Sequence, residues 1–265
     1  MINAIIFGIL QGILEWLPIS SQGNLVILMV GLLGFSPADA TNYAVFLHAG
    51  TLLAAIVYFR KEIWNLVLNL KKYKFSGESS ENRTTTFLIL STFVTGMIGY
   101  PIYRFVQSQR FAGEVFIAFV GAALIATGLI QRFAHKKSFN SEKHLSWKDG
   151  LILGVAQAFS AIPGISRSGI TTSTLLFRNY KAQTALKLSF IMSIPVIFGA
   201  EVGLGLIDGL GSLELSSVFV GCVFAFLAGL ISIHAMIKIA EKVKFWKFCI
   251  GIGIVAILPV LFYLI

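Results

Sequence analysis

The sequence predicts an all-α integral membrane protein in which one structural unit is used twice, with inverted topology. Of the 265 residues, 56% are hydrophobic and 12% are charged, so the apolar surface exceeds what the core of one soluble domain could hide. The apolar residues form long runs that short basic segments separate. Two segments also share one polar signature and mark an internal repeat: Gly8-x-x-Gln11…Pro18-Ile19-Ser20-Ser21 and Gly154-x-x-Gln157…Pro163-Gly164-Ile165-Ser166-Arg167-Ser168-Gly169.

The apolar runs define spans and hairpins. Residues 1–34 and 150–178 are apolar, but Pro and Gly break each near its middle, and neither half could cross a membrane alone. We expect each to form a re-entrant helical hairpin, because backbone N–H groups freed inside a membrane must face protein, a cavity or a polar ligand. The chain then forms a single polytopic domain of two repeats, about 1–131 and 150–265, each with one hairpin and three transmembrane helices. Six runs are long enough to cross a hydrocarbon core of roughly 30 Å: 41–59, 85–103, 112–131, 188–207, 217–237 and 247–265.

The basic residues predict the orientation. Most basic residues lie in four connections between apolar runs, which we therefore expect to be cytoplasmic; the other loops hold only Arg104 and Arg110. With three spans per repeat, both termini then lie outside the cell. The first hairpin would enter from outside and the second from the cytoplasm, so that the broken helices meet near the midplane. Short basic clusters also argue against nucleic-acid binding, despite the net charge of +9. We expect 60–84 to be a solvated connector. The four basic connections, expected to be cytoplasmic, are 60–84, 132–149, 178–187 and 238–247.

Gln11 and Glu15 are candidate ligands for a metal ion. They lie four residues apart, so in a helix both side chains share one face. A carboxylate and an amide carbonyl suit a divalent cation, Mg²⁺ or Ca²⁺, whose coordination is completed by water and by substrate phosphates. In the alternative interpretation, Glu15 is an interfacial carboxylate and Gln11 a helix-packing amide.

Arg167 and its neighbours are candidates for an anion site. The predicted topology places this arginine away from the loops, and Ser166, Ser168 and Thr171 surround it. A guanidinium binds phosphate oxygens in pairs, hydroxyls donate further hydrogen bonds, and the N-terminus of the following helix adds free N–H groups. Alternatively, Arg167 pairs with Glu15 only to stabilise the fold. In the first hairpin, Ser20 and Ser21 could bind phosphate in the same way or could cap the second helix.

Glycine spacing permits close helix packing. Gly8-x-x-x-Gly12 and Gly199-x-x-x-Gly203 place small residues one turn apart, which permits close contact between membrane helices. Such surfaces also allow a homodimer without requiring one.

The signatures resemble those of the undecaprenyl pyrophosphate phosphatase family, also called the bacitracin-resistance family. The similarity in length and in the order of spans extends over essentially the whole chain. The resemblance implies a hydrolase of the plasma (inner) membrane that removes the terminal phosphate of undecaprenyl pyrophosphate, recycles the lipid carrier of cell-wall peptidoglycan synthesis and opens its site outward. The segments that carry it are Gln11-Gly12-Ile13-Leu14-Glu15-Trp16-Leu17-Pro18-Ile19-Ser20-Ser21, Leu47-His48-Ala49-Gly50-Thr51-Leu52-Leu53-Ala54 and Pro163-Gly164-Ile165-Ser166-Arg167-Ser168-Gly169.

The resemblance also implies roles for single residues. The acidic motif of the family matches Gln11 and Glu15, its phosphate-binding motif matches residues 166–168, and a candidate nucleophile matches Ser21. Where the family commonly has Thr-Gly-His after the paired serines, this chain has Gln22-Gly23-Asn24. We expect Asn24 to lie beside the phosphates.

Proton transfer therefore requires another side chain, because an amide cannot exchange a proton near neutral pH. Glu15 is one candidate. His48 lies roughly 10 Å along the first span at 1.5 Å per residue and is a second, although it could equally be a hydrogen-bonded structural histidine.

The favoured hypothesis is metal-assisted phosphoryl transfer from a polyprenyl pyrophosphate lipid. Arg167 would bind the diphosphate, and Ser21 or a metal-bound water would attack in line. A rival hypothesis is a transporter that moves a lipid phosphate or a small anion by rocking of the inverted repeats. A third is a non-catalytic protein that binds lipid phosphates. Release of inorganic phosphate would distinguish the first from the other two.

Overall fold

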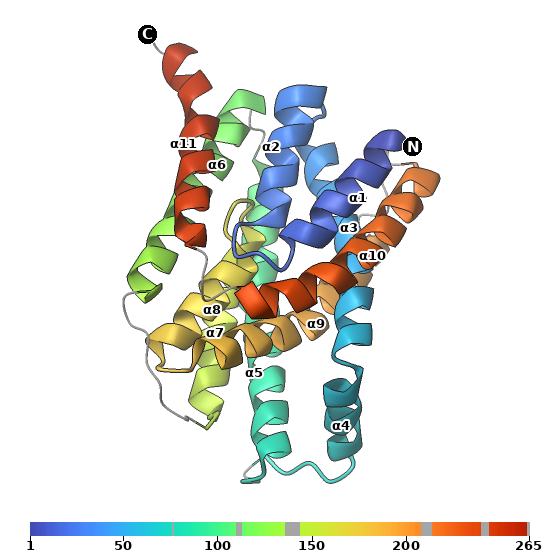
Figure 1. Cartoon of the computed structure of the whole chain (residues 1–265), viewed down its shortest axis with the longest axis vertical. Helices are drawn as coiled ribbons and strands as arrows, with labels where there is room; N and C mark the ends of the chain where they lie inside the picture. Colours follow the sequence, from blue (N-terminus) through green and yellow to red (C-terminus); the bar gives the residue numbers. More distant parts are fainter. Residues whose placement is uncertain (76, 110–112, 136–143, 208–213, 240–243, 264–265) are drawn as a thin grey trace.

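The computed structural model describes residues 1–75, 77–109, 113–135, 144–207, 214–239 and 244–263. Within these residues the chain is helical throughout and contains no strand. The helices are α1 Ile2–Leu14, α2 Ser21–Leu33, α3 Pro37–Tyr58, α4 Arg60–Leu70, α5 Ser80–Ser108, α6 Gly113–His135, α7 Trp147–Ala158, α8 Arg167–Phe177, α9 Ala182–Ile207, α10 Leu215–Ile239 and α11 Phe245–Tyr263, with a 3₁₀ turn at Phe159–Ala161 (Figure 1).

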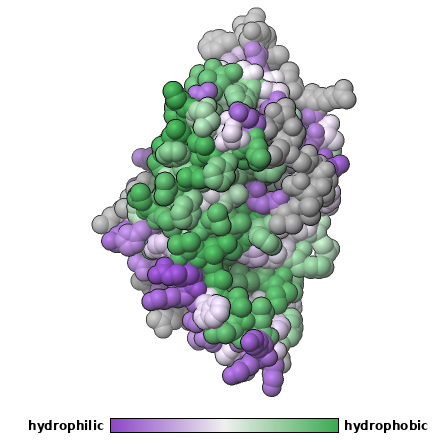
Figure 2. Space-filling view, turned by 90° about the vertical axis from the view of Figure 1, so that its right-hand side faces the viewer, coloured by the Kyte–Doolittle hydropathy of each residue, from purple (hydrophilic) through white to green (hydrophobic). Residues whose placement is uncertain are grey.

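Five of the six predicted spans are confirmed as helices long and apolar enough to cross a membrane: α3, α5, α6, α9 and α10. In the sixth, α11, the apolar part that the structure describes, Phe245–Pro259, is shorter than a full span. Hydrophobic residues cover the central part of one face of the molecule, and hydrophilic residues gather toward its lower end (Figure 2). The chain is therefore a membrane protein. The predicted loop residues 110–111, 136–143, 208–213 and 240–243 lie outside the described residues.

Both predicted helix breaks are present. In the first, α1 ends at Leu14 and α2 begins at Ser21. Pro18 has no N–H group, and Ser20 adopts a left-handed conformation with φ 62° while its Oγ accepts a hydrogen bond from Gly23 N. Each of the four short helices, α1, α2, α7 and α8, has 11 to 13 residues and spans about 20 Å at most.

The second break depends on a glycine. Gly164 has φ +98°, and a Cβ at this position would collide with the carbonyl oxygen of Val120 on α6. The chain then re-enters a helix at Ser166, whose Oγ accepts a hydrogen bond from Gly169 N. Close approach to α6 and a left-handed turn therefore both require glycine here.

Glycine also fixes how α10 packs across α1. A Cβ on Gly12 would lie 2.6 Å from the carbonyl oxygen of Ala225, and one on Gly8 would collide with the backbone of Gly221. The predicted packing role of the Gly8–Gly12 pair is thus confirmed. Gly199 and Gly203 differ, because no atom lies within 4 Å of the position that a Cβ would occupy on either one. Within one chain, the close packing that their spacing permits is therefore not used.

The prediction of a solvated connector over 60–84 was wrong in part, because helices occupy both ends of that range. Residues Arg60–Leu70 form α4. Ile63 and Leu66 share one face of this helix and pack against a buried cluster that includes Phe59, and Lys187 Nζ lies 2.8 Å from Glu62 Oε1. The basic residues at both ends of α4 obscured this amphipathic pattern in the sequence.

The start of α7, outside the five spans, is held by a buried carboxylate. Asp149 is fully buried, and its two oxygens accept hydrogen bonds from Arg178 Nε at 2.8 Å, from the Tyr180 hydroxyl at 3.0 Å and from Ser146 N at 3.0 Å. Burial alone would raise the pKa of Asp149, but the hydrogen bonds from Ser146, Arg178 and Tyr180 outweigh it and hold that pKa below its ordinary value.

We predict that Asp149→Asn lowers the free energy of unfolding by ~2 kcal/mol at pH 7, because it weakens several charge-assisted hydrogen bonds. Since folding depresses the pKa, the stabilisation is present above the unfolded value of about 3.9 and is lost as the pH falls from there toward the folded value. Thermal unfolding in detergent should show a constant difference from pH 7 to about 5 and a shrinking one below about 4. The control is Glu114→Gln, an exposed acid in the first turn of α6. Equal losses of unfolding free energy in the two variants would contradict the role of Asp149 in stabilising the start of α7.

Candidate functional site

The carboxylate of Glu15 is the centre of the site. It is buried at the end of α1, with 6% of the residue exposed. Its Oε2 accepts hydrogen bonds from Gln11 Nε2 at 3.0 Å and from Ser21 Oγ at 2.6 Å, and it lies 3.1 Å from His48 Nε2. Its Oε1 pairs with the guanidinium of Arg167. Residues predicted separately from the two repeats are thus brought together around one carboxylate.

The geometry follows from the breaks in the helices. Gln11 lies one helical turn before Glu15, and the break after α1 brings Ser21, the first residue of α2, back beside it. Arg167 is the first residue of α8 and therefore lies at the break of the second hairpin. His48 reaches the carboxylate from α3.

The N-terminus of α8 is suited to bind an anion. Its first residue is Arg167, and the hydroxyls of Ser166 and Ser168 lie 3.3 Å apart beside it. The first N–H groups of the helix point out of its end and add a favourable dipole. Guanidinium, hydroxyls and free N–H groups are the donors that a phosphate group requires.

The ring of His48 lies between two oxygen atoms. Nδ1 lies 2.7 Å from the carbonyl oxygen of Ala44, and Nε2 lies 3.1 Å from the carboxylate of Glu15. A carbonyl oxygen and an ionised carboxylate both accept hydrogen bonds, so this geometry suits a ring with a hydrogen on each nitrogen. The histidine is therefore placed to hold a proton beside Glu15.

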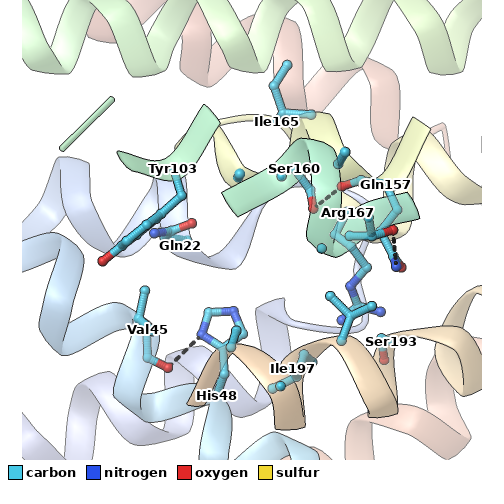
Figure 3. Close-up of a pocket in the computed structure, with 18 of the residues that line it drawn as sticks. Gln22, Val45, His48, Tyr103, Gln157, Ser160, Ile165, Arg167, Ser193 and Ile197 are labelled. Atoms are coloured by element: carbon cyan, nitrogen blue, oxygen red, sulfur yellow. Dashed lines mark hydrogen bonds between the residues drawn. The ribbon is translucent and has the colours of Figure 1, made fainter. Parts of the chain in front are cut away.

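A cavity of about 400 Å³ opens beside these groups (Figure 3). His48 and Arg167 both point into it, from α3 and α8 respectively. Seven of the ten predicted site residues line it: Glu15, Ser20, Ser21, His48, Ser166, Arg167 and Ser168.

The other three predicted residues lie apart from the cavity. Asn24 Nδ2 donates to the carbonyl oxygens of Ile19 and Ser20, at 2.7 and 2.8 Å, and so holds the turn of the first hairpin. Thr171 Oγ1 is 2.7 Å from the hydroxyl of Ser189. Gln11 is fully buried behind Glu15. The structure therefore gives Asn24 and Thr171 contacts within the protein instead of contacts at the cavity wall.

The donors around Glu15 do not fit a metal ion held between Gln11 and Glu15. Gln11 Oε1 is buried without a hydrogen-bond partner, which would suit a cation. Gln11, however, directs its N–H group at Glu15, and both oxygens of Glu15 already face donors, two of them from cationic side chains. No cluster of three His, Cys, Asp or Glu residues occurs in the described part of the chain.

Helix α6 holds the breaks of both hairpins, which the sequence analysis missed. Thr127 Oγ1 donates to the carbonyl oxygen of Gly164 at 3.3 Å and accepts from Ser166 N at 3.1 Å. One turn later, Gln131 Nε2 donates to the carbonyl oxygen of Pro18. The sequence signal that could have revealed this role is a pair of polar residues, four positions apart, in an otherwise apolar run; both are buried.

We predict that Thr127→Val lowers the free energy of unfolding by about 1–3 kcal/mol, because it leaves a buried N–H and a buried carbonyl group without partners. Thr127→Ser should retain most of the stability. Thermal unfolding in detergent measures both. The matched control is Thr174→Val, which removes a hydroxyl bonded to the carbonyl oxygen of Ile170 on its own helix. If both valine variants lose the same stability, Thr127 does not stabilise the second break in the way proposed.

Comparison with known proteins gives consistent results. A family model described as bacitracin resistance protein BacA matches residues 4–258. Curated relatives named undecaprenyl-diphosphatase include a protein of Methanococcoides burtonii, 45% identical over 260 residues and 97% of both chains, and one of Haloarcula marismortui, 34% identical over 257 residues and 95% of both chains. A third, from Syntrophotalea carbinolica, is 37% identical over 254 residues and 94% of both chains.

Proposed function

We propose, from the premise that the chain belongs to the bacitracin resistance protein BacA family, that it is an undecaprenyl-diphosphatase. Its substrate is undecaprenyl pyrophosphate or a similar long-chain polyprenyl pyrophosphate, and its products are the lipid monophosphate and inorganic phosphate. The reaction recycles the lipid carrier of cell-wall synthesis. The observation that carries the proposal is the 2.6 Å hydrogen bond from Ser21 Oγ to a carboxylate whose other oxygen binds Arg167.

Ser21 is the nucleophile in this proposal. Glu15 Oε2 takes the proton of the Ser21 hydroxyl as Oγ attacks the terminal phosphorus. The bond between that phosphorus and the bridging oxygen breaks, and the lipid monophosphate leaves. Water then attacks the phosphoserine, and the bond between phosphorus and Ser21 Oγ breaks. Glu15 returns to Oγ the proton that it took, and the hydrogens of the water leave on the inorganic phosphate. The net change is addition of one water across the anhydride bond.

The surrounding cations stabilise charge and hold a proton. Arg167 and the N-terminus of α8 bind the oxygens of the transferring phosphate, where negative charge develops. His48 Nε2–H points at Glu15 and can donate to an oxygen of the leaving group in the cavity. This arrangement supplies proton transfer without a histidine at Asn24.

A divalent cation enters the proposal only with the substrate. Gln11 and Glu15 are occupied by each other and by neighbouring donors, so we route no step through a metal bound between them. Mg²⁺ or Ca²⁺ would instead accompany the diphosphate as its counterion.

The finer topology belongs to this proposal. We propose that α1–α2 and α7–α8 are re-entrant hairpins of an inverted repeat in the plasma membrane, with both termini and the cavity mouth on the external side. Their short helices and the shared signature support this arrangement. A homodimer is compatible with it.

We predict that Arg167→Lys lowers kcat/KM for phosphate release by roughly 10²–10³, because an ammonium cannot bind two phosphate oxygens in the geometry of a guanidinium. The assay follows inorganic phosphate released from undecaprenyl pyrophosphate by purified protein in detergent. The control is Arg60→Lys, at an exposed position at the start of α4, and it should behave as wild type.

Wild-type turnover in folded Arg167→Lys would show that this arginine is structural. Wild-type protein that binds the lipid but releases no phosphate under any ionic condition would contradict the phosphatase proposal and favour a transporter or a binding protein.

A further inference from the structure

Gln157 is a buried amide at the cavity that the proposed mechanism does not use. It is fully buried and lines the cavity. It lies in the last turn of α7, which ends at Ala158, and Arg167 is the first residue of α8, so the two side chains come from opposite sides of the break in the second hairpin. Figure 3 shows Gln157 and Arg167 at one end of this cavity. The amide is therefore placed beside the group that we assign to the phosphate.

The hydrogen bonds of Gln157 fix the orientation of its amide. Nε2 donates to Thr95 Oγ1 at 3.2 Å, and Thr95 Oγ1 in turn donates to the carbonyl oxygen of Gly154 at 3.1 Å. A hydroxyl has one hydrogen, so Thr95 can only accept from the amide, and the amide must present its nitrogen to Thr95. The amide oxygen, Oε1, then points elsewhere and has no hydrogen-bond partner. A buried acceptor of this kind indicates that a bound water or ligand completes the site.

The missing partner of Oε1 is a hydrogen-bond donor. Ionised phosphate oxygens accept hydrogen bonds, so the head of the substrate does not satisfy an amide oxygen. Ser160 does not satisfy it either, because its hydroxyl is donated to the backbone carbonyl oxygen of Gln157 at 2.6 Å. A water molecule in the cavity can donate to Oε1 and approach a phosphate bound by Arg167. The proposed reaction consumes one water in its second step, so the unpartnered acceptor and the required nucleophile match.

Two other residues have similar oxygen atoms at the cavity. Thr92 Oγ1 and Glu201 Oε1 are buried without a hydrogen-bond partner, and both residues line the cavity. Within the described residues, however, no hydrogen bond holds either side chain in one orientation. Gln157 Oε1 is held in place by the bond from its amide to Thr95, and orienting a nucleophile requires such a fixed group.

We infer that Gln157 Oε1 orients the water that hydrolyses the phosphoserine. This role rests on the proposed function and concerns its second step. The water donates one hydrogen bond to Oε1 while its oxygen forms the bond to phosphorus opposite Ser21 Oγ, and the bond between phosphorus and Oγ breaks. Gln157 itself gains and loses no proton, because both hydrogens of the water leave on the inorganic phosphate. Its removal should therefore slow hydrolysis of the phosphoserine and spare its formation.

Gln157→Met tests this role, because it keeps the approximate volume of the side chain and removes the amide oxygen. Thr95 still donates to Gly154, so the fold should be retained, and thermal unfolding checks this. Purified protein is mixed with undecaprenyl pyrophosphate that carries radioactive phosphorus in its terminal phosphate, and after an acid quench the label is counted in lipid, protein and free phosphate. We expect label to leave the lipid in the first turnover within about twofold of the wild-type rate, to remain on Ser21, and to appear as free phosphate at least roughly tenfold more slowly.

Two further variants keep the test decisive. Thr95→Val frees the amide of Gln157 and should slow the same step by a smaller factor, so it also decides if Gln157→Met does not fold. The matched control is Thr92→Val, which removes another unpartnered oxygen from the cavity wall and should leave both steps within about twofold of wild type.

Three outcomes overturn the role: phosphate release by Gln157→Met at the wild-type rate, a loss of equal size in the two steps with no label retained on the protein, or Thr92→Val matching Gln157→Met. If Thr95→Val alone is folded, a loss of equal size in its two steps, or wild-type release, overturns the role in the same way. Failure of the proposed function looks different, because wild-type protein then removes no label from the lipid, and the role falls with it.

Discussion

The structure depends on one buried carboxylate that joins the two halves of the chain. Glu15 lies at the end of α1 and contacts the start of α2, the middle of α3 and the start of α8, through Ser21, His48 and Arg167. A buried ion pair is a poor source of stability, because removing two charges from water costs several kcal/mol per ion. We explain the pair by the proposed function, in which it brings a nucleophile, a proton acceptor and a phosphate-binding cation within one hydrogen-bond network.

The rest of the fold keeps two broken helices in position around that carboxylate. Breaks inside an apolar bundle leave backbone groups without helical partners, and α6 supplies partners for both through Thr127 and Gln131. Gly164 allows the second break to approach α6 closely. The second break also places the N-terminus of α8 at the cavity, where we propose that it binds phosphate.

Much of this arrangement could be predicted from local sequence. Pro18 and Gly164 mark the breaks because their effects are local, and Glu15 and Arg167 stand out because charged residues are rare inside apolar segments. Contacts between distant segments could not be predicted in this way. The amphipathic face of α4 was obscured by flanking charges, Thr127 was one polar residue in a span, and the spacing of Gly199 and Gly203 does not distinguish a packed surface from an open wall.

The central claim is that Glu15 acts on Ser21, and a double-mutant cycle in phosphate release tests it most directly. Glu15→Gln, Ser21→Ala and the double variant are compared by kcat/KM after thermal unfolding shows that each is folded. If the two residues act as one unit, each single change lowers the rate about as much as both together. Losses that multiply in the double variant, or wild-type turnover in Glu15→Gln, would contradict the account.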